Sequence, residues 1–194
     1  MTRSPCAAAI LAGGKARRFG GQDKCRLVVG GVPIIVRQLE VLQRVARSVF
    51  VIAPEAARFA DLGLPVYADL IPDIGAMGGL YTALEVAGEE LVFAVACDLP
   101  FLDAGVLSSL ATLAAGADGA WVRTPGGVEP LLACYRRAAR HALRCEIDAG
   151  RLKLADLGRA LDMRELAGDE LARFGPIERL VANVNSPDDY ARIQ

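Results

Sequence analysis

The sequence of 194 residues has little histidine, no closely spaced cysteine pair and no long hydrophobic run. Its only histidine, His141, lies in a basic stretch with a helical pattern, where a solvated surface position is favoured over a catalytic role. The five cysteines are scattered without a C-x-x-C spacing, which argues against a zinc site or a disulfide framework and predicts a reducing, cytoplasmic location. No apolar run approaches the ~18 residues of a membrane-spanning helix. Glycines and basic residues directly follow the short apolar run near Met1, so we do not expect an export signal.

The sequence also has no excess of positive or negative charge. The net charge is −1, which argues against a general binder of nucleic acid or of membrane surfaces. Hydrophobic residues make up 53% of the chain and charged residues 23%, as is typical of a globular protein. The length fits a single domain over residues 1–194 with one sizeable core.

Short apolar runs bounded by glycine, proline or aspartate predict the strands. These are Cys6–Leu11, Val49–Ala53, Pro65–Ala68, Leu91–Ala96, Gly119–Arg123, Glu129–Tyr135, Met163–Leu166 and Leu180–Asn183. Helical patterns lie between several of them, and Pro33, Asp103 and Ser186 are suited to the first turns of three helices. The alternation predicts one α/β domain of three layers (α/β/α) with a mostly parallel, Rossmann-like sheet. Ligands of such sheets bind beyond the carboxyl ends of the strands.

A glycine-rich basic segment, "LAGGKARRFGGQDK" (Leu11–Lys24), follows the first predicted strand. It matches neither the P-loop pattern nor the G-x-G-x-x-G dinucleotide pattern. Backbone N–H groups near Gly13 and Gly14 are suited to phosphate oxygens, and Arg18 and Lys24 to neutralising their charge. An exposed turn that is basic for solubility is the alternative.

Two further segments end predicted strands at the same edge of the sheet. In "VFAVACDLPFL", Asp98 follows a buried strand and is placed to hold Mg²⁺ together with substrate phosphates, although a turn or capping aspartate has the same pattern. In "VYADLIPDIGAMGG", Asp69 is suited to accept hydrogen bonds from a nucleotide base, and glycines such as Gly78 allow close approach of the backbone. Asp73 is suited to the turn between Asp69 and these glycines.

These segments together resemble the molybdenum cofactor guanylyltransferases, within the wider family of molybdopterin and sugar-phosphate nucleotidyltransferases. The family pattern of L-A-G-G, R-M-G and D-K is similar to "LAGG", "RRFG" and "DK" here, and its C-D-x-P to "CDLP". Its G-P-L-G-G segment is similar to "GAMGG", and its N-V-N-[ST]-P to "NVNSP" near residue 185. The likeness runs from about residue 7 to residue 193.

The resemblance implies a role for each matching residue. Leu11, Ala12, Gly13 and Gly14 would line the GTP site, with Arg18 and Lys24 on the phosphates. Asp69 would bind the nucleoside and Asp98 both the nucleotide and Mg²⁺, while Asn183 and Asn185 would face the pterin. Three departures stand out: Phe19 in place of methionine, Ala76-Met77 in place of Pro-Leu, and Ile52 where some members carry asparagine.

The implied reaction transfers GMP from GTP to molybdenum-loaded molybdopterin and releases pyrophosphate. A molybdopterin cytidylyltransferase would share every phosphate feature but often carries L-A-A-G, and a sugar-phosphate nucleotidyltransferase would lack "NVNSP". A carrier that binds nucleotide or cofactor without catalysis is the non-enzyme alternative, and the presence of both Lys24 and Asp98 speaks against it.

Contact with molybdoenzymes or their chaperones is a hypothesis that rests on the expected lability of the cofactor. For the basic stretch 136–153 a solvated helix face is favoured over a surface that approaches the anionic pterin. For Trp121 a core position is favoured over a stacking platform.

Overall fold

A computed structural model describes residues 5–13 and 24–193. Its centre is a seven-stranded sheet with the order β5-β4-β1-β6-β8-β7-β9. The strands are β1 (Cys6–Leu11), β4 (Ser48–Ile52), β5 (Val66–Tyr67), β6 (Leu91–Ala96), β7 (Gly119–Thr124), β8 (Gly127–Arg136) and β9 (Met163–Leu166). Only β8 runs against its two neighbours, so the expected mostly parallel sheet is confirmed. A small antiparallel pair, β2 (Val28–Val29) and β3 (Val32–Pro33), lies apart from it.

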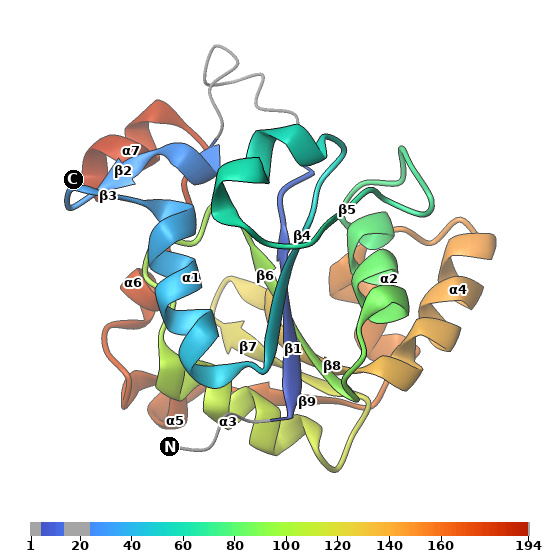
Figure 1. Cartoon of the computed structure of the whole chain (residues 1–194). Helices are drawn as coiled ribbons and strands as arrows, with labels where there is room; N and C mark the ends of the chain where they lie inside the picture. Colours follow the sequence, from blue (N-terminus) through green and yellow to red (C-terminus); the bar gives the residue numbers. More distant parts are fainter. Residues whose placement is uncertain (1–4, 14–23, 194) are drawn as a thin grey trace.

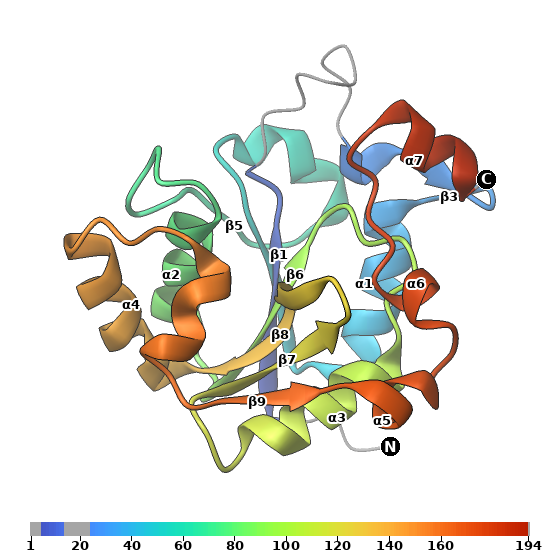
Figure 2. The ribbon, with the colours of Figure 1, turned by 180° about the vertical axis from the view of Figure 1, so that it is seen from behind.

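Helices cover both faces of the sheet, as Figures 1 and 2 show from opposite sides. The longer helices are α1 (Ile34–Val45), α2 (Ala76–Val86), α3 (Ala104–Ala114) and α4 (Arg140–Asp148). The shorter α-helices are α5 (Gly168–Ala172), α6 (Ile177–Leu180) and α7 (Pro187–Arg192). Short 3₁₀ helices span Lys24–Arg26, Ala56–Leu62, Arg137–Ala139 and Leu154–Arg159.

The alternation of side chains along β1 produces two separate cores. Ile10 and its neighbours on one face pack with Leu42 of α1 and Leu107 of α3. On the other face, Ala7, Ala9 and Leu11 belong to the core that includes Leu80 of α2 and Leu143 of α4. Every residue of β1 is buried, as the uninterrupted apolar run predicts for a strand that helices cover on both sides. The predicted α/β/α layering is therefore confirmed.

Helix capping follows the sequence closely. The Asp103 side chain accepts hydrogen bonds from the backbone N–H groups of Gly105 and Val106, at 2.8 and 3.0 Å, and starts α3. Ser186 and Asp189 form a capping box at the start of α7, where Pro187 takes the first helical position. Pro33 lies at the N-cap of α1.

The strand predicted over Leu180–Asn183 is wrong. Residues around it form α6 and a turn, because the N–H groups of Leu180 and Val181 donate to the carbonyls of Pro176 and Ile177. Leu180 and Val184 are buried but Ala182 between them is only partly buried, so the segment lacks the alternating burial of a half-buried strand. Beyond α6 the chain runs along the turn after β6, and the Val184 N–H donates to the Asp98 carbonyl at 3.0 Å.

The two structural expectations for single residues hold. Trp121 is 3% exposed and packs in the core beneath α2 and α4, and His141 is exposed on α4. Across the described ranges, no helix is long and apolar enough to cross a membrane.

Candidate functional site

A cavity of about 780 Å³ opens at the carboxyl ends of β4, β1 and β6. The last residues of these strands, Ile52, Leu11 and Ala96, are paired side by side in the sheet and form its floor. The lining also includes Ala12, Gly13, Lys24, Pro54, Ala68, Asp69, Pro72, Asp73, Gly75, Ala76, Gly79, Cys97, Asp98 and Leu131. The three sequence segments singled out for chemistry therefore meet in one place.

The residues that follow β1, Ala12 and Gly13, form one wall of the cavity. The Ala12 N–H donates to the Ile52 carbonyl at 2.8 Å and the Cys97 N–H to the Leu11 carbonyl at 3.2 Å, which holds the strand ends together. A Cβ atom on Gly13 would lie 3.8 Å from the Asp69 carboxylate, in ordinary van der Waals contact, so the segments that carry Gly13 and Asp69 lie next to each other. Gly14 and Arg18, predicted as phosphate contacts, lie outside the described residues.

Asp98 stands at the turn after β6 with 17% of its side chain exposed. Burial raises the pKa of its carboxyl above the ordinary value, and the nearby Lys24 ammonium opposes that shift. The Lys24 Nζ atom lies 3.8 Å from Asp98 Oδ2. Asp98 also lines the cavity, so its carboxylate is the candidate ligand for a magnesium ion, which one or two carboxylates usually hold.

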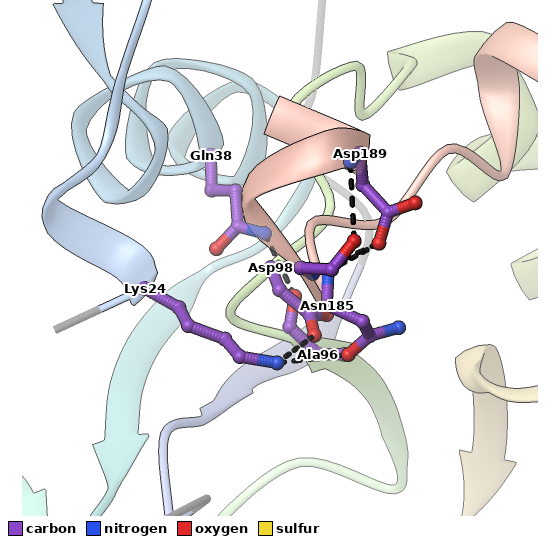
Figure 3. A network of polar contacts seen from close by, with 7 residues as sticks. Lys24, Gln38, Ala96, Asp98, Asn185 and Asp189 are labelled. Atoms are coloured by element: carbon purple, nitrogen blue, oxygen red, sulfur yellow. Dashed lines mark hydrogen bonds and ion pairs between the residues drawn. The ribbon is translucent and has the colours of Figure 1, made fainter. Parts of the chain in front are cut away.

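Lys24 is held in place by its neighbours in the 3₁₀ helix. Cys25 is fully buried, and Arg26 forms a two-pronged ion pair with Asp61 and also donates to the Arg58 carbonyl. These contacts fix the start of the described chain after the glycine-rich segment and direct the Lys24 side chain toward Asp98. Figure 3 shows the Lys24 ammonium reaching the carboxylate.

Asn185 completes this cluster from a distant part of the chain (Figure 3). Its Oδ1 atom accepts a hydrogen bond of 2.8 Å from Lys24 Nζ. The backbone N–H groups of Asn185 and Ser186 both donate to the Asp189 carboxylate, which fixes the turn before α7. The structure thus places Asn185 beside Lys24 and Asp98. Asn183 is exposed and does not line the cavity.

Asp69 forms the opposite wall of the cavity. Its Oδ1 atom is buried and has no hydrogen-bond partner among the residues that the structure describes, and burial raises the pKa of the carboxyl. A buried acceptor without a donor carries a desolvation cost of about 1–3 kcal/mol, which a ligand N–H group would offset. Next to it, Pro72 and Asp73 form a turn in which Asp73 has φ 64, the only positive φ of a non-glycine residue in the described chain.

Gly78 does not line the cavity; its neighbours Gly75, Ala76 and Gly79 do. A Cβ atom on Gly78 would lie 2.6 Å from the Ile71 carbonyl oxygen and 3.0 Å from the Ile74 side chain. Gly78 therefore lets α2 approach the loop that carries Pro72 and Asp73, and its role toward a base is to shape that loop.

We expect Gly78→Ala to lower the free energy of unfolding by about 1–2 kcal/mol. Forcing a backbone atom aside costs up to about 3 kcal/mol, and the higher helix propensity of alanine offsets about 0.5–1 kcal/mol of that cost. Urea unfolding measures the change. Gly88→Ala is the matched control, because no atom lies within 4 Å of its Cβ position, and it should stay within about 0.5 kcal/mol of the parent chain. A Gly78→Ala protein as stable as this control would contradict the packing role.

The basic stretch 136–153 lies away from the cavity. Arg140 pairs with Glu85, Arg144 with Asp148 and Arg151 with Glu146, so these charges are neutralised at the surface of α4. The expected solvated helix face is confirmed.

Some lining residues were not found from the sequence. Pro54 and Leu131 carry no chemical signal, and only the fold brings β8 to the cavity. Gln38, which is buried behind the cavity and does not line it, was also missed, although an amide on the apolar face of a helix between Ile35 and Leu42 was a signal.

The donor set fits a magnesium ion with nucleotide. Over residues 5–13 and 24–193 no three histidine, cysteine or acidic side chains come together as a complete metal site. Magnesium does not require one, since it is usually held by one or two carboxylates and completed by water and phosphate oxygens. Asp98 offers a carboxylate at the wall of a cavity large enough for a nucleotide.

A cavity beyond the carboxyl ends of a mostly parallel sheet, with a cation and two partly buried carboxylates, defines an α/β protein of the nucleotide-binding class. The model of the MobA-like NTP transferase domain matches residues 8–164, and the chain belongs to this family of nucleotidyltransferases.

Relatives agree along nearly the whole chain. A Cereibacter sphaeroides protein named molybdenum cofactor guanylyltransferase is 33% identical over 190 residues, covering 95% of this chain and 93% of its own. A Carboxydothermus hydrogenoformans protein with the name "Probable molybdenum cofactor guanylyltransferase" is 33% identical over 185 residues, with 95% and 93% covered. Among solved structures, molybdopterin-guanine dinucleotide biosynthesis protein A from Archaeoglobus fulgidus superposes with a TM-score of 0.80 at 26% identity, with 96% of each chain covered.

Proposed function

We propose that this protein transfers GMP from GTP to molybdenum-loaded molybdopterin, giving the guanine dinucleotide form of the cofactor and pyrophosphate. The names of its relatives support guanine and the pterin. The observation that carries the proposal is the contact of Lys24 with both Asp98 and Asn185, because it joins the nucleotide cavity to the "NVNSP" turn. An acceptor bound at that turn would lie beside the phosphates of the nucleotide.

The reaction requires that the two substrates be positioned in line and that negative charge on the phosphates be stabilised. An oxygen of the pterin phosphate attacks the α-phosphorus of GTP, the new P–O bond forms, and the bond to the β-phosphate oxygen breaks to release pyrophosphate. The attacking phosphate is already ionised at neutral pH, so no general base is needed. In-line placement and stabilisation of charge on the leaving group then supply the rate enhancement.

The residues of this cavity divide these tasks. Lys24 contacts the phosphates and neutralises charge that develops on pyrophosphate, with Arg18 proposed to assist. Asp98 would hold Mg²⁺, which adds positive charge at the phosphates when it is bound. Asp69, with its unpartnered buried oxygen, accepts a hydrogen bond from the nucleoside. Asn185, and with it Asn183, orients the acceptor.

The test is transfer of α-labelled nucleotide to molybdenum-loaded molybdopterin with Mg²⁺, comparing GTP with CTP. Label transfer from GTP alone supports the proposal. Transfer from CTP alone would keep the phosphate chemistry and refute guanine, while binding of nucleotide without transfer from either would favour a carrier. Removing Mg²⁺ with a chelator should stop the reaction.

The pH dependence of transfer reports on Asp98. Burial raises its pKa, so the acid limb of kcat/KM should lie above the ordinary aspartate pKa of about 3.9. Transfer should rise as the pH increases through this limb, because only the ionised carboxylate holds a cation. More Mg²⁺ should move the limb to lower pH, since metal and proton compete for the same oxygen.

A pH profile at two Mg²⁺ concentrations checks this prediction. Glu129 supplies the control, because burial also raises its pKa and it does not line the cavity. Glu129→Gln should leave the acid limb where it is. A limb that ignores Mg²⁺ would show that another group governs it.

The setting of the reaction is proposed from the same chemistry. The five cysteines are free thiols, in keeping with the cytoplasm. A labile cofactor favours direct hand-over to molybdoenzymes or their chaperones, and pull-downs with cofactor-loaded and unloaded protein test it.

A further inference from the structure

Apart from the Tyr135 phenol and the cysteines, two uncharged polar side chains are completely buried in the described chain, Gln38 on α1 and Thr82 on α2. Each lies on the apolar face of its helix, against a different side of the central sheet. A buried amide or hydroxyl is unfavourable unless it is hydrogen-bonded, so the partners of these two groups indicate what they do.

The Gln38 amide is bonded to the turn that carries Asp98 (Figure 3). Its Nε2 atom donates to the Ala96 carbonyl at 2.8 Å and to the Leu99 carbonyl at 2.9 Å. These carbonyls stand on either side of Asp98, so one side chain clamps the backbone before and after the carboxylate. The Oε1 atom of the same amide is buried without a partner in the described chain.

That unpartnered oxygen is informative because it carries a cost that an apolar side chain of the same size would avoid. The two donated bonds are the favourable part of burying Gln38. They act on backbone that would otherwise present two carbonyls to the apolar interior beneath the cavity.

Thr82 has the corresponding contact on the other wall. Its Oγ1 atom accepts a hydrogen bond of 2.9 Å from the Leu70 N–H and donates one of 2.8 Å to the Gly78 carbonyl. Leu70 directly follows Asp69. The hydroxyl therefore ties the strand end that bears Asp69 to the first turn of α2, on the side of the cavity assigned to the nucleoside.

We propose that Gln38 and Thr82 are positioning residues, each serving one carboxylate of the cavity: Gln38 sets Asp98 at the phosphates, and Thr82 sets Asp69 at the nucleoside. The proposal rests on the function proposed above. It gives the two buried groups separate effects, since neither touches the other's carboxylate. Groups that orient a metal ligand from behind change metal affinity or activity by about 10–100-fold when they are removed.

The experiment compares Gln38→Met and Thr82→Val, which remove the hydrogen bonds while nearly keeping side-chain volume. Initial rates of GMP transfer are measured over a range of GTP and of Mg²⁺ concentrations. Gln38→Met should lower kcat about 10–100-fold and raise the Mg²⁺ concentration for half-maximal rate, with KM for GTP little changed. Thr82→Val should raise KM for GTP about tenfold, with the Mg²⁺ requirement unchanged.

Each variant is the matched control for the other, because both remove a buried hydrogen-bonding group from a helix beneath the cavity. Thr82→Ser should restore KM, since it restores the hydroxyl. Gln38→Leu also lacks the donors, so it should behave as Gln38→Met does. Equal effects of Gln38→Met and Thr82→Val on both parameters, or full activity of Gln38→Leu, would overturn the proposal.

A binding measurement separates this proposal from the proposed function. Binding of Mn²⁺ and of GTP is followed by the paramagnetic signal of Mn²⁺ and by calorimetry, at a temperature where each variant is folded. Wild-type protein that binds Mn²⁺ with GTP but transfers nothing refutes the function. The positioning roles then still predict weaker Mn²⁺ binding in Gln38→Met and weaker GTP binding in Thr82→Val, and unchanged binding in both would refute them.

Discussion

Asp98→Asn should reduce GMP transfer by about 10²–10³-fold and at the same time raise the melting temperature at pH 7. The loss of rate follows from removing the carboxylate that would hold Mg²⁺, judged by the cost of deleting one preorganised electrostatic contact. The gain in stability follows from the pKa of Asp98, which burial raises above the value in the unfolded chain. The folded state therefore binds that proton more tightly, and an ionised Asp98 opposes folding.

The stability gain of Asp98→Asn should depend on pH. Stability is lost as pH rises from the unfolded pKa toward the raised folded pKa, and the full penalty stays at neutral pH. Asparagine carries no charge, so its advantage should be complete at pH 7 and shrink as pH falls toward about 3.9. Thermal unfolding at a series of pH values measures it. Asp148→Asn, which removes an exposed carboxylate on α4, is the control and should change neither rate nor this pH profile. A destabilised Asp98→Asn protein at pH 7 would mean that pairing with Lys24 outweighs burial.

Lys24→Met should lower transfer by a similar factor, about 10²–10³-fold, but with the opposite effect on stability. The substitution removes the cation 3.8 Å from Asp98 and the donor to Asn185, and leaves a buried negative charge. Breaking a fully buried ion pair costs about 3–5 kcal/mol. Here both side chains stay about a fifth exposed, so we expect a loss of about 1–2 kcal/mol.

Stopped-time transfer assays and urea unfolding on the same samples measure both quantities. The double variant Lys24→Met with Asp98→Asn should recover the stability lost in Lys24→Met, because no unpaired charge remains, yet stay inactive. A double variant as unstable as Lys24→Met would mean that the Lys24 contact with Asn185 carries the effect. Transfer at the wild-type rate in Lys24→Met would remove Lys24 from the mechanism.

The fold could be predicted where one local signal was sufficient. Strands such as β1 and β6 are apolar without interruption because helices cover both faces of the sheet, and their bounds agree with the structure to the residue. The caps of α3 and α7 depend on side chains within four residues. The segment Leu180–Asn183 failed because a short apolar run has the same appearance in a strand and in a helical turn.

Several residues that line the cavity could be predicted, but their arrangement could not. Asp69 and Asp98 were found because carboxyl ends of parallel strands share one edge. The contact between Lys24 and Asn185 spans 161 positions of sequence, and no local pattern specifies it. Gln38 was counted as part of a helix whose apolar face was correctly recognised, and the backbone it clamps lies 58 and 61 positions away.

The junction between the two ends of the described chain also sets an order of events during synthesis. Lys24 obtains its Asn185 partner only after the ribosome has added a residue 161 positions later. The Tyr190 hydroxyl, which donates to the Val28 carbonyl at 2.7 Å, follows 162 positions after its partner. The central sheet is encoded earlier and can form first. The cavity at the carboxyl ends of the strands can therefore form before the turn that carries Asn185 has been synthesised. The contact between Lys24 and Asn185, which joins the cavity to that turn, forms only late in translation.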